Sequence, residues 1–288
     1  MIYRFAIIGG GLTAVSTLCQ LVDRLEHMAD EGRTRGARLG IEIFEKHDTV
    51  GPGLPHNGDY VLPFHITNMC AKDMTVRISR PDDFQKWVHK NAVDLNLRFQ
   101  KHDIHFSAPD PATDQCSHYP REVMGEYLIS QLEDAVSRAK DLGIGLEIRT
   151  NCEVLDLWPE DSLLYLRSRN KTGIQTDGPF HGALLATGHW CESSRFDNYF
   201  ASPWPASKLR AAIPPGAEVG VIGSSLSAIE TALTLTSEGQ FRRLGSGRLH
   251  YAPPDLPRKI TLFSRRGLIP RVRGRIGTRK NRYFTCER

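Results

Sequence analysis

The sequence predicts an α/β protein that contains two strand–glycine turn–helix units. Residues 5–22 carry no charge and contain three consecutive glycines, and an apolar segment near residue 220 ends in a similar turn. Each turn is followed by apolar residues at helical spacing. With 288 residues, 40% hydrophobic and 24% charged, the composition excludes disordered, collagen-like and coiled-coil classes.

The first half of the chain predicts alternating strands and helices around an irregular segment. We expect strands at about 3–8, 40–45, 147–149, 153–158, 163–168 and 181–186. We expect helices at about 12–29, 81–95 and 121–141. Residues 30–38 are charged, residues 48–82 have weak periodicity, and residues 171–179 have the composition of a turn.

Four prolines in residues 202–215 predict a linker between two domains. We therefore divide the chain into residues 1–212 and residues 213–288. The second domain begins with a strand at Glu218 and a helix that ends near Glu238. A further strand is expected at 259–264, after a connection rich in Gly, Arg and Pro.

The six cysteines are scattered and form no CxxC pair, which favours reduced thiols and a cytoplasmic protein. The uncharged N-terminal stretch could be a signal peptide or a membrane span. Its glycines and the polar residues Thr13, Ser16 and Gln20 favour a buried strand followed by a buried helix. We therefore expect no membrane partner.

The first glycine turn fits the pattern GxGxxG/A, directly after a strand and before a helix. In this pattern Gly9 allows a tight turn, Gly11 allows the backbone to approach a pyrophosphate, and Ala14 allows close packing of helix and strand. Backbone N–H groups at the helix start would bind phosphates. The predicted dinucleotide site comprises Gly9, Gly10, Gly11, Leu12, Thr13 and Ala14. The alternative is a glycine-rich turn without a ligand.

An acidic residue at the end of the second strand would bind the adenosine ribose, and Glu45 stands there. Glu45 lies 34 residues after Gly11, whereas about 20 is usual. The charged segment at 30–38 explains the difference as an insertion. We include the adjacent Lys46 in the same predicted site.

The second glycine turn contains Gly223, Ser224 and Ser225, with Ser225 where the second glycine normally stands. We expect these serines to bind phosphate or to cap the helix. Arg265 and Arg266 follow the next strand, where an NAD site would have an acid. Guanidinium groups suit the 2′-phosphate of NADP. The alternative is a solvated basic turn.

The net charge of +4 is unevenly distributed. Residues 258–288 contain 11 basic residues and one acid, whereas residues 1–257 contain 26 basic and 32 acidic residues. A basic end of this kind can bind nucleic acid. Because no nucleic-acid-binding fold is recognisable and the rest of the chain is acidic, we expect a small-molecule substrate and no nucleic-acid partner.

Together these motifs resemble the two-dinucleotide-binding flavoproteins, in particular the bacterial FAD/NAD(P)-binding proteins that include FAD-dependent urate hydroxylases. The N-hydroxylating monooxygenases are more distantly similar. The matching stretches are residues 5–14, 45–53, 64–68, 81–87, 119–128, 185–188, 220–230 and 264–270. The resemblance implies a Rossmann-like FAD-binding domain with a three-layer β/β/α arrangement, followed by an incomplete Rossmann-like NAD(P) domain.

The resemblance also implies roles for individual residues. Ala186, Thr187 and Gly188 resemble the family's ATG turn near the flavin, and Val154 resembles the position whose backbone contacts adenine. Residues 51–56 and Asn68 would approach the isoalloxazine ring. FAD would lie in the first cradle, formed by the glycine turn at residues 9–14 and Glu45. NADPH would lie in the second cradle, formed by the glycine turn at residues 223–225 with Arg265 and Arg266. Arg121 and Tyr127 match the family pattern without a defined role.

The resemblance implies an FAD-dependent NAD(P)H oxidoreductase that hydroxylates a small polar or heterocyclic substrate. Members of this group usually continue well beyond 288 residues, and their returning segment carries a Gly-Asp pair that has no counterpart after Arg266. We therefore expect a fragment, a truncated product or a degenerate protein. The alternative function is a non-catalytic FAD- or nucleotide-binding protein.

Several histidines are ambiguous in the sequence. His102 and His105, with Asp103 between them, suggest a metal pair, but without a third ligand at matching spacing we expect a surface loop. His56 and His65 could face the flavin or be ordinary loop residues. His189 and Trp190 could close over a cofactor or pack at the domain junction.

Overall fold

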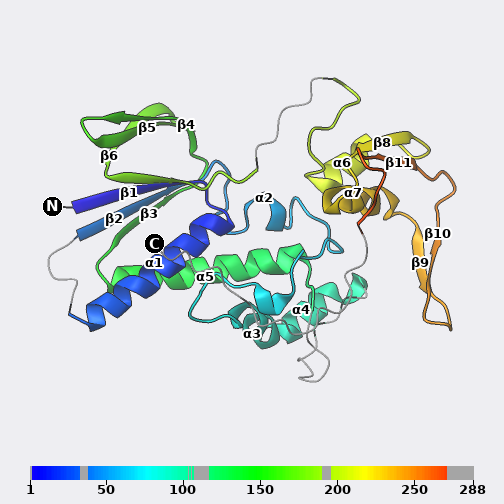
Figure 1. The fold of residues 1–288 in the computed structure, drawn as a ribbon, viewed down its shortest axis with the longest axis horizontal. Helices are drawn as coiled ribbons and strands as arrows, with labels where there is room; N and C mark the ends of the chain where they lie inside the picture. The colour runs from blue at the N-terminus through cyan, green and yellow to red at the C-terminus, as the bar shows by residue number, and fades with distance from the viewer. Residues whose placement is uncertain are drawn as a thin grey trace. The chain divides into compact units, whose positions relative to one another are not determined.

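The computed structural model describes residues 2–32, 38–102, 104, 106, 117–189 and 196–270. The chain forms two compact units, Met1–Leu209 and Arg210–Arg288, which are described separately (Figure 1). The predicted division after residue 212 lies three residues further along the chain. The assignment of the two parts to different cofactors stays a prediction.

A parallel sheet with the strand order β3-β2-β1-β7 forms the centre of the first unit. Its strands are β1 (Ile2–Ile8), β2 (Arg38–Phe44), β3 (Gly145–Arg149) and β7 (Gly182–Leu185). Ile8 pairs with both Phe44 and Leu185, so three strands end at the same edge. The glycine turn after β1 therefore lies at the carboxyl edge of the sheet.

Helices cover one face of this sheet and a second sheet covers the other (Figure 1). The helices are α1 (Leu12–Asp30) and α5 (Arg121–Asp141), and the antiparallel sheet contains β4 (Glu153–Glu160), β5 (Leu163–Asn170) and β6 (Gly173–Phe180). Ile7 faces the core beneath the helices, whereas Ala6 and Ile8 face a second core with Phe180. This alternation confirms the predicted three-layer β/β/α arrangement.

The segment between β2 and α5 contains short helices: α2 (Gly53–His56), η1 (Ala71–Asp73), α3 (Asp83–Lys90), α4 (Ala92–Phe99) and η2 (Gln100–His102). The prediction of one helix over 81–95 was wrong. Asn91 ends α3, since its side-chain amide donates to the Trp87 carbonyl at 2.8 Å. The Asn91 carbonyl then accepts from Leu95 N and begins α4.

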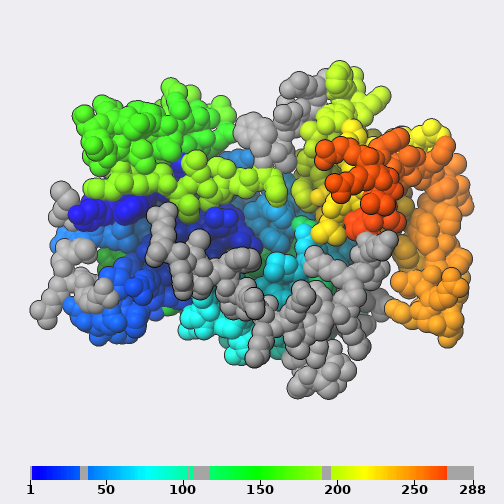
Figure 2. Space-filling model, viewed as in Figure 1, coloured from blue at the N-terminus to red at the C-terminus, as the bar shows by residue number. Residues whose placement is uncertain are grey.

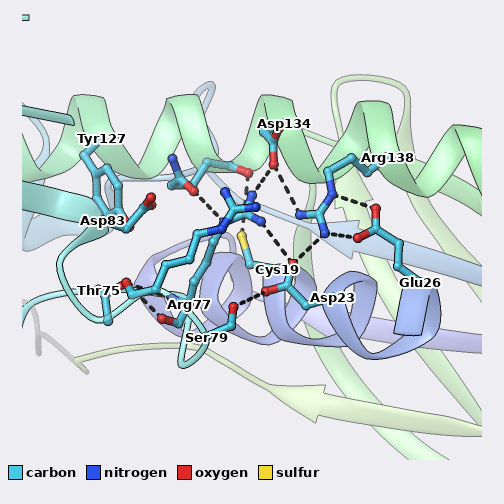
Figure 3. A network of polar contacts seen from close by, with 12 residues as sticks. Cys19, Asp23, Glu26, Thr75, Arg77, Ser79, Asp83, Tyr127, Asp134 and Arg138 are labelled. Atoms are coloured by element: carbon cyan, nitrogen blue, oxygen red, sulfur yellow. Dashed lines mark hydrogen bonds and ion pairs between the residues drawn. The ribbon is translucent and has the colours of Figure 1, made fainter. Parts of the chain in front are cut away.

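Arg77 connects the segment between β2 and α3 to helices α1 and α5 (Figure 3). Its side chain is 1% exposed and forms ion pairs with Asp23 of α1 and Asp134 of α5. Arg138 of α5 also pairs with Asp23, at 2.6 Å, and with Glu26. A buried guanidinium needs such partners because desolvation of an isolated charge is costly.

The turn predicted at 171–179 was wrong, because most of these residues belong to β6. Gly173 pairs with Asn170, and the strand continues antiparallel to β5 as far as Phe180. Gly178 and Pro179 gave the misleading turn signal. Proline is tolerated here because β6 is an edge strand of the sheet β4-β5-β6, where one side of the backbone has no ladder partner.

The second unit contains β8 (Glu218–Ile222), α7 (Leu226–Thr236) and β11 (Lys259–Phe263). Strands β8 and β11 form a parallel pair, as the second strand–turn–helix unit predicted. The proline-rich linker contains a helix, α6 (Ala206–Ala212), which the sequence analysis missed. The antiparallel hairpin of β9 (Gln240–Arg243) and β10 (Leu249–Ala252) was also missed.

The expectation that all thiols are reduced was wrong for one residue. Cys19 and Cys152 are free, but Cys70 is disulfide-bonded. Sequence spacing does not reveal such a bond, because it depends on proximity in the fold. Within the described ranges, no helix combines the length and apolarity needed to cross a membrane.

Candidate dinucleotide sites

The first glycine turn is fixed by contacts between neighbouring strands. Gly9 has φ +100°, and a Cβ atom there would lie 2.3 Å from the Ala186 carbonyl oxygen. Its N–H donates to the Phe44 carbonyl at 2.8 Å, and Ala186 N donates to the Ile8 carbonyl at 2.8 Å. Any larger residue at Gly9 would collide with backbone, so the turn requires glycine.

Glu45 is buried and holds the middle of this turn. Its Oε2 accepts from Gly10 N at 2.7 Å, and its Oε1 accepts from His47 N at 2.9 Å. The sequence pattern predicted a ribose contact for Glu45 but gave no signal of its contact with Gly10. A carboxylate has about four acceptor positions, so two hydrogen bonds leave capacity for a ligand.

The start of α1 is open to a ligand. Gly11 is the N-cap, no side chain among the described residues caps the helix, and its first turn contains no acid. Leu12 and Thr13 are exposed, whereas Ala14 is fully buried beneath the helix. The first N–H groups of an α-helix have no intrahelical acceptor, and they attract anions.

The loop after Glu45 lies against the glycine turn. Gly51 N donates to the Gly10 carbonyl at 2.7 Å, and a Cβ atom on Gly53 would lie 3.3 Å from the Gly11 Cα. A Cβ atom on Gly125 of α5 would lie 2.1 Å from the His56 carbonyl oxygen. Close packing on both sides thus fixes residues 51–56 beside the first cradle.

His56 is a neutral imidazole at neutral pH. Burial, and then the positive charge of Arg121, lowers its pKa to about 4. Its Nδ1 is buried and has no hydrogen-bond partner within the described part of the chain. Buried polar atoms usually have a partner, so this atom has unused hydrogen-bonding capacity beside the first cradle.

Asn68 is exposed, and the buried Arg121 orients its side chain. The Arg121 Nη2 donates to Asn68 Oδ1 at 3.1 Å, and the Arg121 Nε donates to the Ile66 carbonyl at 3.2 Å. Arg121 is the first residue of α5. The sequence pattern did not reveal this positioning role, because the two side chains are 53 residues apart.

The other predicted residues of the first site follow the ends of neighbouring strands. Thr187 and Gly188 are exposed after β7, and Lys46 is exposed after β2. Val154 lies half-buried on β4. The Cys152 N–H donates to the Glu45 carbonyl at 2.9 Å, which links the start of the second sheet to the end of β2. Contact of these residues with a cofactor stays a prediction.

The second glycine turn has the same backbone shape with fewer surrounding contacts. Gly223 has φ +116°, and a Cβ atom added there would meet no atom of the described residues within 4 Å. Ser225 is the N-cap of α7, but its side chain makes no capping hydrogen bond, so the predicted helix-cap role was wrong. Ser225 is exposed, so water can satisfy its hydroxyl in place of the helix N–H groups. Ser224 Oγ donates to the Leu268 carbonyl at 2.6 Å.

A shallow pocket of about 550 Å³ lies beside this turn, between the residues that follow β8 and those that follow β11. Its lining brings together four predicted residues from two strand ends, Ser224, Ser225, Arg265 and Arg266, with Ser264 and residues 268–270. Both arginines are exposed. The pocket has the charge and the hydroxyl groups that a phosphate would need.

The remaining histidine predictions are only partly covered. His102 ends η2, but Asp103 and His105 lie outside the described residues. His189 is exposed. Trp190 lies outside the described residues. His65 is buried, and its Nδ1 accepts from Leu62 N at 3.2 Å, which is an ordinary role within the loop.

A parallel sheet with an open helix start, an acidic residue after the second strand and a covering antiparallel sheet defines a dinucleotide-binding protein. The family model described as FAD-NAD(P)-binding matches residues 6–190, and the chain belongs to this family. The chain is 26% identical over 274 residues to the uncharacterized protein YdhS of Escherichia coli (strain K12). This alignment covers 93% of the chain and 46% of YdhS.

Solved structures that match the chain include two ornithine hydroxylases. The ornithine N-hydroxylase KtzI of Kutzneria sp. 744 superimposes with a TM-score of 0.53 at 14% identity, over 91% of this chain and 53% of KtzI. The ornithine hydroxylase PvdA of Pseudomonas aeruginosa has a TM-score of 0.44 at 17% identity. The match covers 82% of this chain and 52% of PvdA. The first comparison supports the α/β fold. The chain spans about half the length of these relatives.

Proposed function

We propose that the chain is an FAD-dependent, NAD(P)H-using oxidoreductase of the hydroxylating monooxygenase type. Its substrate would be a small polar or heterocyclic molecule. The single observation that carries the proposal is the first cradle, where Glu45 and Ala186 fix a glycine turn that leads into an uncapped helix. Membership of the FAD-NAD(P)-binding family supports the choice of cofactors.

The residues of the first cradle fit FAD. Backbone N–H groups at the start of α1 would bind the pyrophosphate, because no side chain that the structure describes caps this helix. Gly11 leaves room for it, since the nearest atom to a Cβ position is Gly53 Cα at 3.5 Å. Glu45 would use its remaining acceptor positions on the ribose hydroxyls.

The bound flavin would supply electron transfer and oxygen activation, which no amino-acid side chain provides. The chain would orient it. The loop at 51–56, fixed between the glycine turn and α5, would lie along the cofactor, and Asn68 would be held in place by Arg121. His56 would remain uncharged at neutral pH and could exchange hydrogen bonds with a polar ring edge.

The second cradle would hold NADPH. Ser224 and Ser225 would contact phosphate at the start of α7, and Arg265 and Arg266 would bind the 2′-phosphate in the shared pocket. This arrangement favours NADPH over NADH because only NADPH carries that phosphate.

The test is anaerobic reduction of the FAD-loaded chain by NADPH, followed by flavin absorbance. Bleaching supports the oxidoreductase. Bound flavin that NADPH does not bleach would support the second candidate, a non-catalytic FAD- or nucleotide-binding protein. A chain that takes up no FAD would refute the proposed oxidoreductase.

A paired variant tests the choice of nicotinamide cofactor. Arg265→Ala with Arg266→Ala should weaken NADPH binding by about a hundredfold or more and leave NADH binding nearly unchanged, as expected for loss of two charge-assisted contacts. Arg167→Ala with Arg169→Ala removes the same charge from β5 and serves as the control. Equal losses for NADPH and NADH would contradict the 2′-phosphate assignment.

A further inference from the structure

The second unit carries an exposed hairpin that takes no part in the proposed cofactor sites. Strand β9 pairs with β10, with Tyr251 opposite Phe241. Tyr251 anchors the base, because its hydroxyl donates to the Thr236 carbonyl at 3.1 Å and its ring fills the space beside Gly239. The hairpin extends from the rest of its unit (Figures 1 and 2). Isolated two-stranded hairpins are marginally stable, so a covering partner would stabilise it.

The two faces of the hairpin differ in chemistry, since successive side chains of a strand point to opposite sides. One face carries Phe241, Arg243, Leu249 and Tyr251, and the other carries Gln240, Arg242, His250 and Ala252. Phe241 is 55% exposed and Leu249 is 64% exposed. Leu244, at the turn, is 48% exposed. The first face therefore presents apolar surface together with a guanidinium group.

The composition of the hairpin indicates a protein partner. Residues 240–252 include three arginines, a phenylalanine and a tyrosine, with no lysine and no acid. Arginine and aromatic residues are enriched in protein interfaces, whereas lysine and acidic residues are depleted at their cores. The partner surface should be acidic, because the hairpin contains no acid to neutralise its arginines.

The first unit of the chain has the opposite charge balance. Residues 1–209 contain 22 basic and 28 acidic residues, whereas residues 210–288 contain 15 basic and five acidic residues. Two copies can therefore attract each other through units of opposite charge. Hairpin against hairpin is disfavoured, since like charges would face each other across the strands.

We propose that the β9–β10 hairpin docks on the acidic first unit of a second copy of the chain. In a two-fold dimer each copy would receive the hairpin of the other, which is the commonest symmetry of homo-oligomers. Phe241, Leu244 and Leu249 would supply the apolar contact. Arg243 would provide the charge complementarity. This proposal does not depend on the proposed enzymatic activity.

Sedimentation velocity of the full chain tests the proposal. We expect a dimer that weakens about tenfold or more when NaCl rises from about 50 to about 500 mM. Arg243→Glu, Leu249→Asn and Leu244→Asn should each weaken it about tenfold or more. Arg242→Glu, on the opposite face, has the same charge change and should alter it less than about threefold. A monomer under all conditions, or equal effects of Arg242→Glu and Arg243→Glu, would overturn the proposal.

Cross-linking identifies the docking surface. A photo-reactive benzoylphenylalanine at Leu244 is activated in a mixture of ¹⁴N- and ¹⁵N-labelled chains. We expect mixed-isotope cross-links to residues 1–209. Cross-links within one chain, between two hairpins, or to anionic phospholipid vesicles added in place of a second copy would overturn the assignment. Because Leu244 is at an exposed turn, its substitution should leave the fold intact, which circular dichroism checks.

Discussion

The two glycine turns have similar backbone shapes but very different surroundings. Gly9 is enclosed by the Ala186 carbonyl, and its neighbour Gly10 is bound to Glu45. Gly223 has a similar positive φ, yet within the described part of the chain a Cβ atom there would meet nothing within 4 Å. The preceding Ile222 is 86% exposed. Each turn is held by a hydrogen bond to the neighbouring strand, Gly9 N to the Phe44 carbonyl and Gly223 N to the Phe263 carbonyl, but only the first is also enclosed by packed backbone.

Gly9→Ala should have the largest effect. The new Cβ would lie 2.3 Å from a carbonyl oxygen that strand pairing holds in place, in addition to the strain of φ +100°. We expect a loss of more than about 4 kcal/mol in the free energy of unfolding, measured by urea denaturation.

Gly223→Ala is the matched control, since it introduces the strain of a positive φ without the collision. This variant should lower the free energy of unfolding by only about 1–2 kcal/mol. Equal losses for the two variants would show that the surroundings of the first turn do not matter.

Arg77→Met should have the next largest effect. It leaves Asp23 and Asp134 without their buried guanidinium and detaches the irregular segment from α1 and α5 (Figure 3). We expect the free energy of unfolding to fall by about 3 kcal/mol. This is the low end of the range for a broken buried ion pair, because the Asp134 side chain is half-exposed. Arg80→Met, three residues further along and exposed, should change stability by less than about 0.5 kcal/mol. A similar loss for both variants in urea denaturation would contradict the anchoring role.

His56 should make the first unit sensitive to acid. Its pKa is about 4 in the fold and 6.5 in the unfolded chain, so between these values the unfolded state binds more protons. Stability must therefore fall as the pH drops from 6.5 to 4. The contribution lost is on the order of 2–3 kcal/mol.

The measurement is the free energy of unfolding at a series of pH values, for the natural chain and for His56→Gln. The variant should lose the part of the pH dependence that lies in this window. An unchanged pH profile in the variant, or an NMR titration of His56 near pH 6.5, would exclude the buried neutral imidazole.

Glu45→Gln should have the smallest effect on stability and a clear effect on FAD. A side-chain amide presents one acceptor and one donor group, so it cannot accept from both Gly10 N and His47 N. We expect a loss of about 1–2 kcal/mol in stability and about tenfold weaker FAD binding, measured by calorimetry. Glu153→Gln on β4, whose side chain is 44% exposed, is the control. Unchanged FAD affinity in Glu45→Gln would remove Glu45 from the site.

The parts of the fold that sequence could predict are those with local signals. The turn at Gly9 and the strand that begins at Glu218 are each flanked by periodic apolar residues, and both were located correctly. The β6 strand was mistaken for a turn because Gly178 and Pro179 are typical turn residues, and only its position at a sheet edge allows the proline in a strand.

In the candidate site, too, local signals could be read from the sequence and long-range contacts could not. The residues of the first cradle could be named from their spacing, but the hydrogen bonds of Glu45 to Gly10 and of Arg121 to Asn68 could not. Each bond joins residues far apart in the chain, 35 positions in the first case and 53 in the second, and no local pattern encodes such a distance. The hairpin was missed because Gly245 and Gly247 suggested an irregular connection.

Equilibrium titration of the apo chain with FAD tests the central claim most directly. Flavin fluorescence and calorimetry should show saturable one-to-one binding that Glu45→Gln weakens and that Gly223→Ala leaves unchanged. An absence of binding by the folded natural chain, or equal weakening by the two variants, would contradict the assignment of FAD to the first cradle.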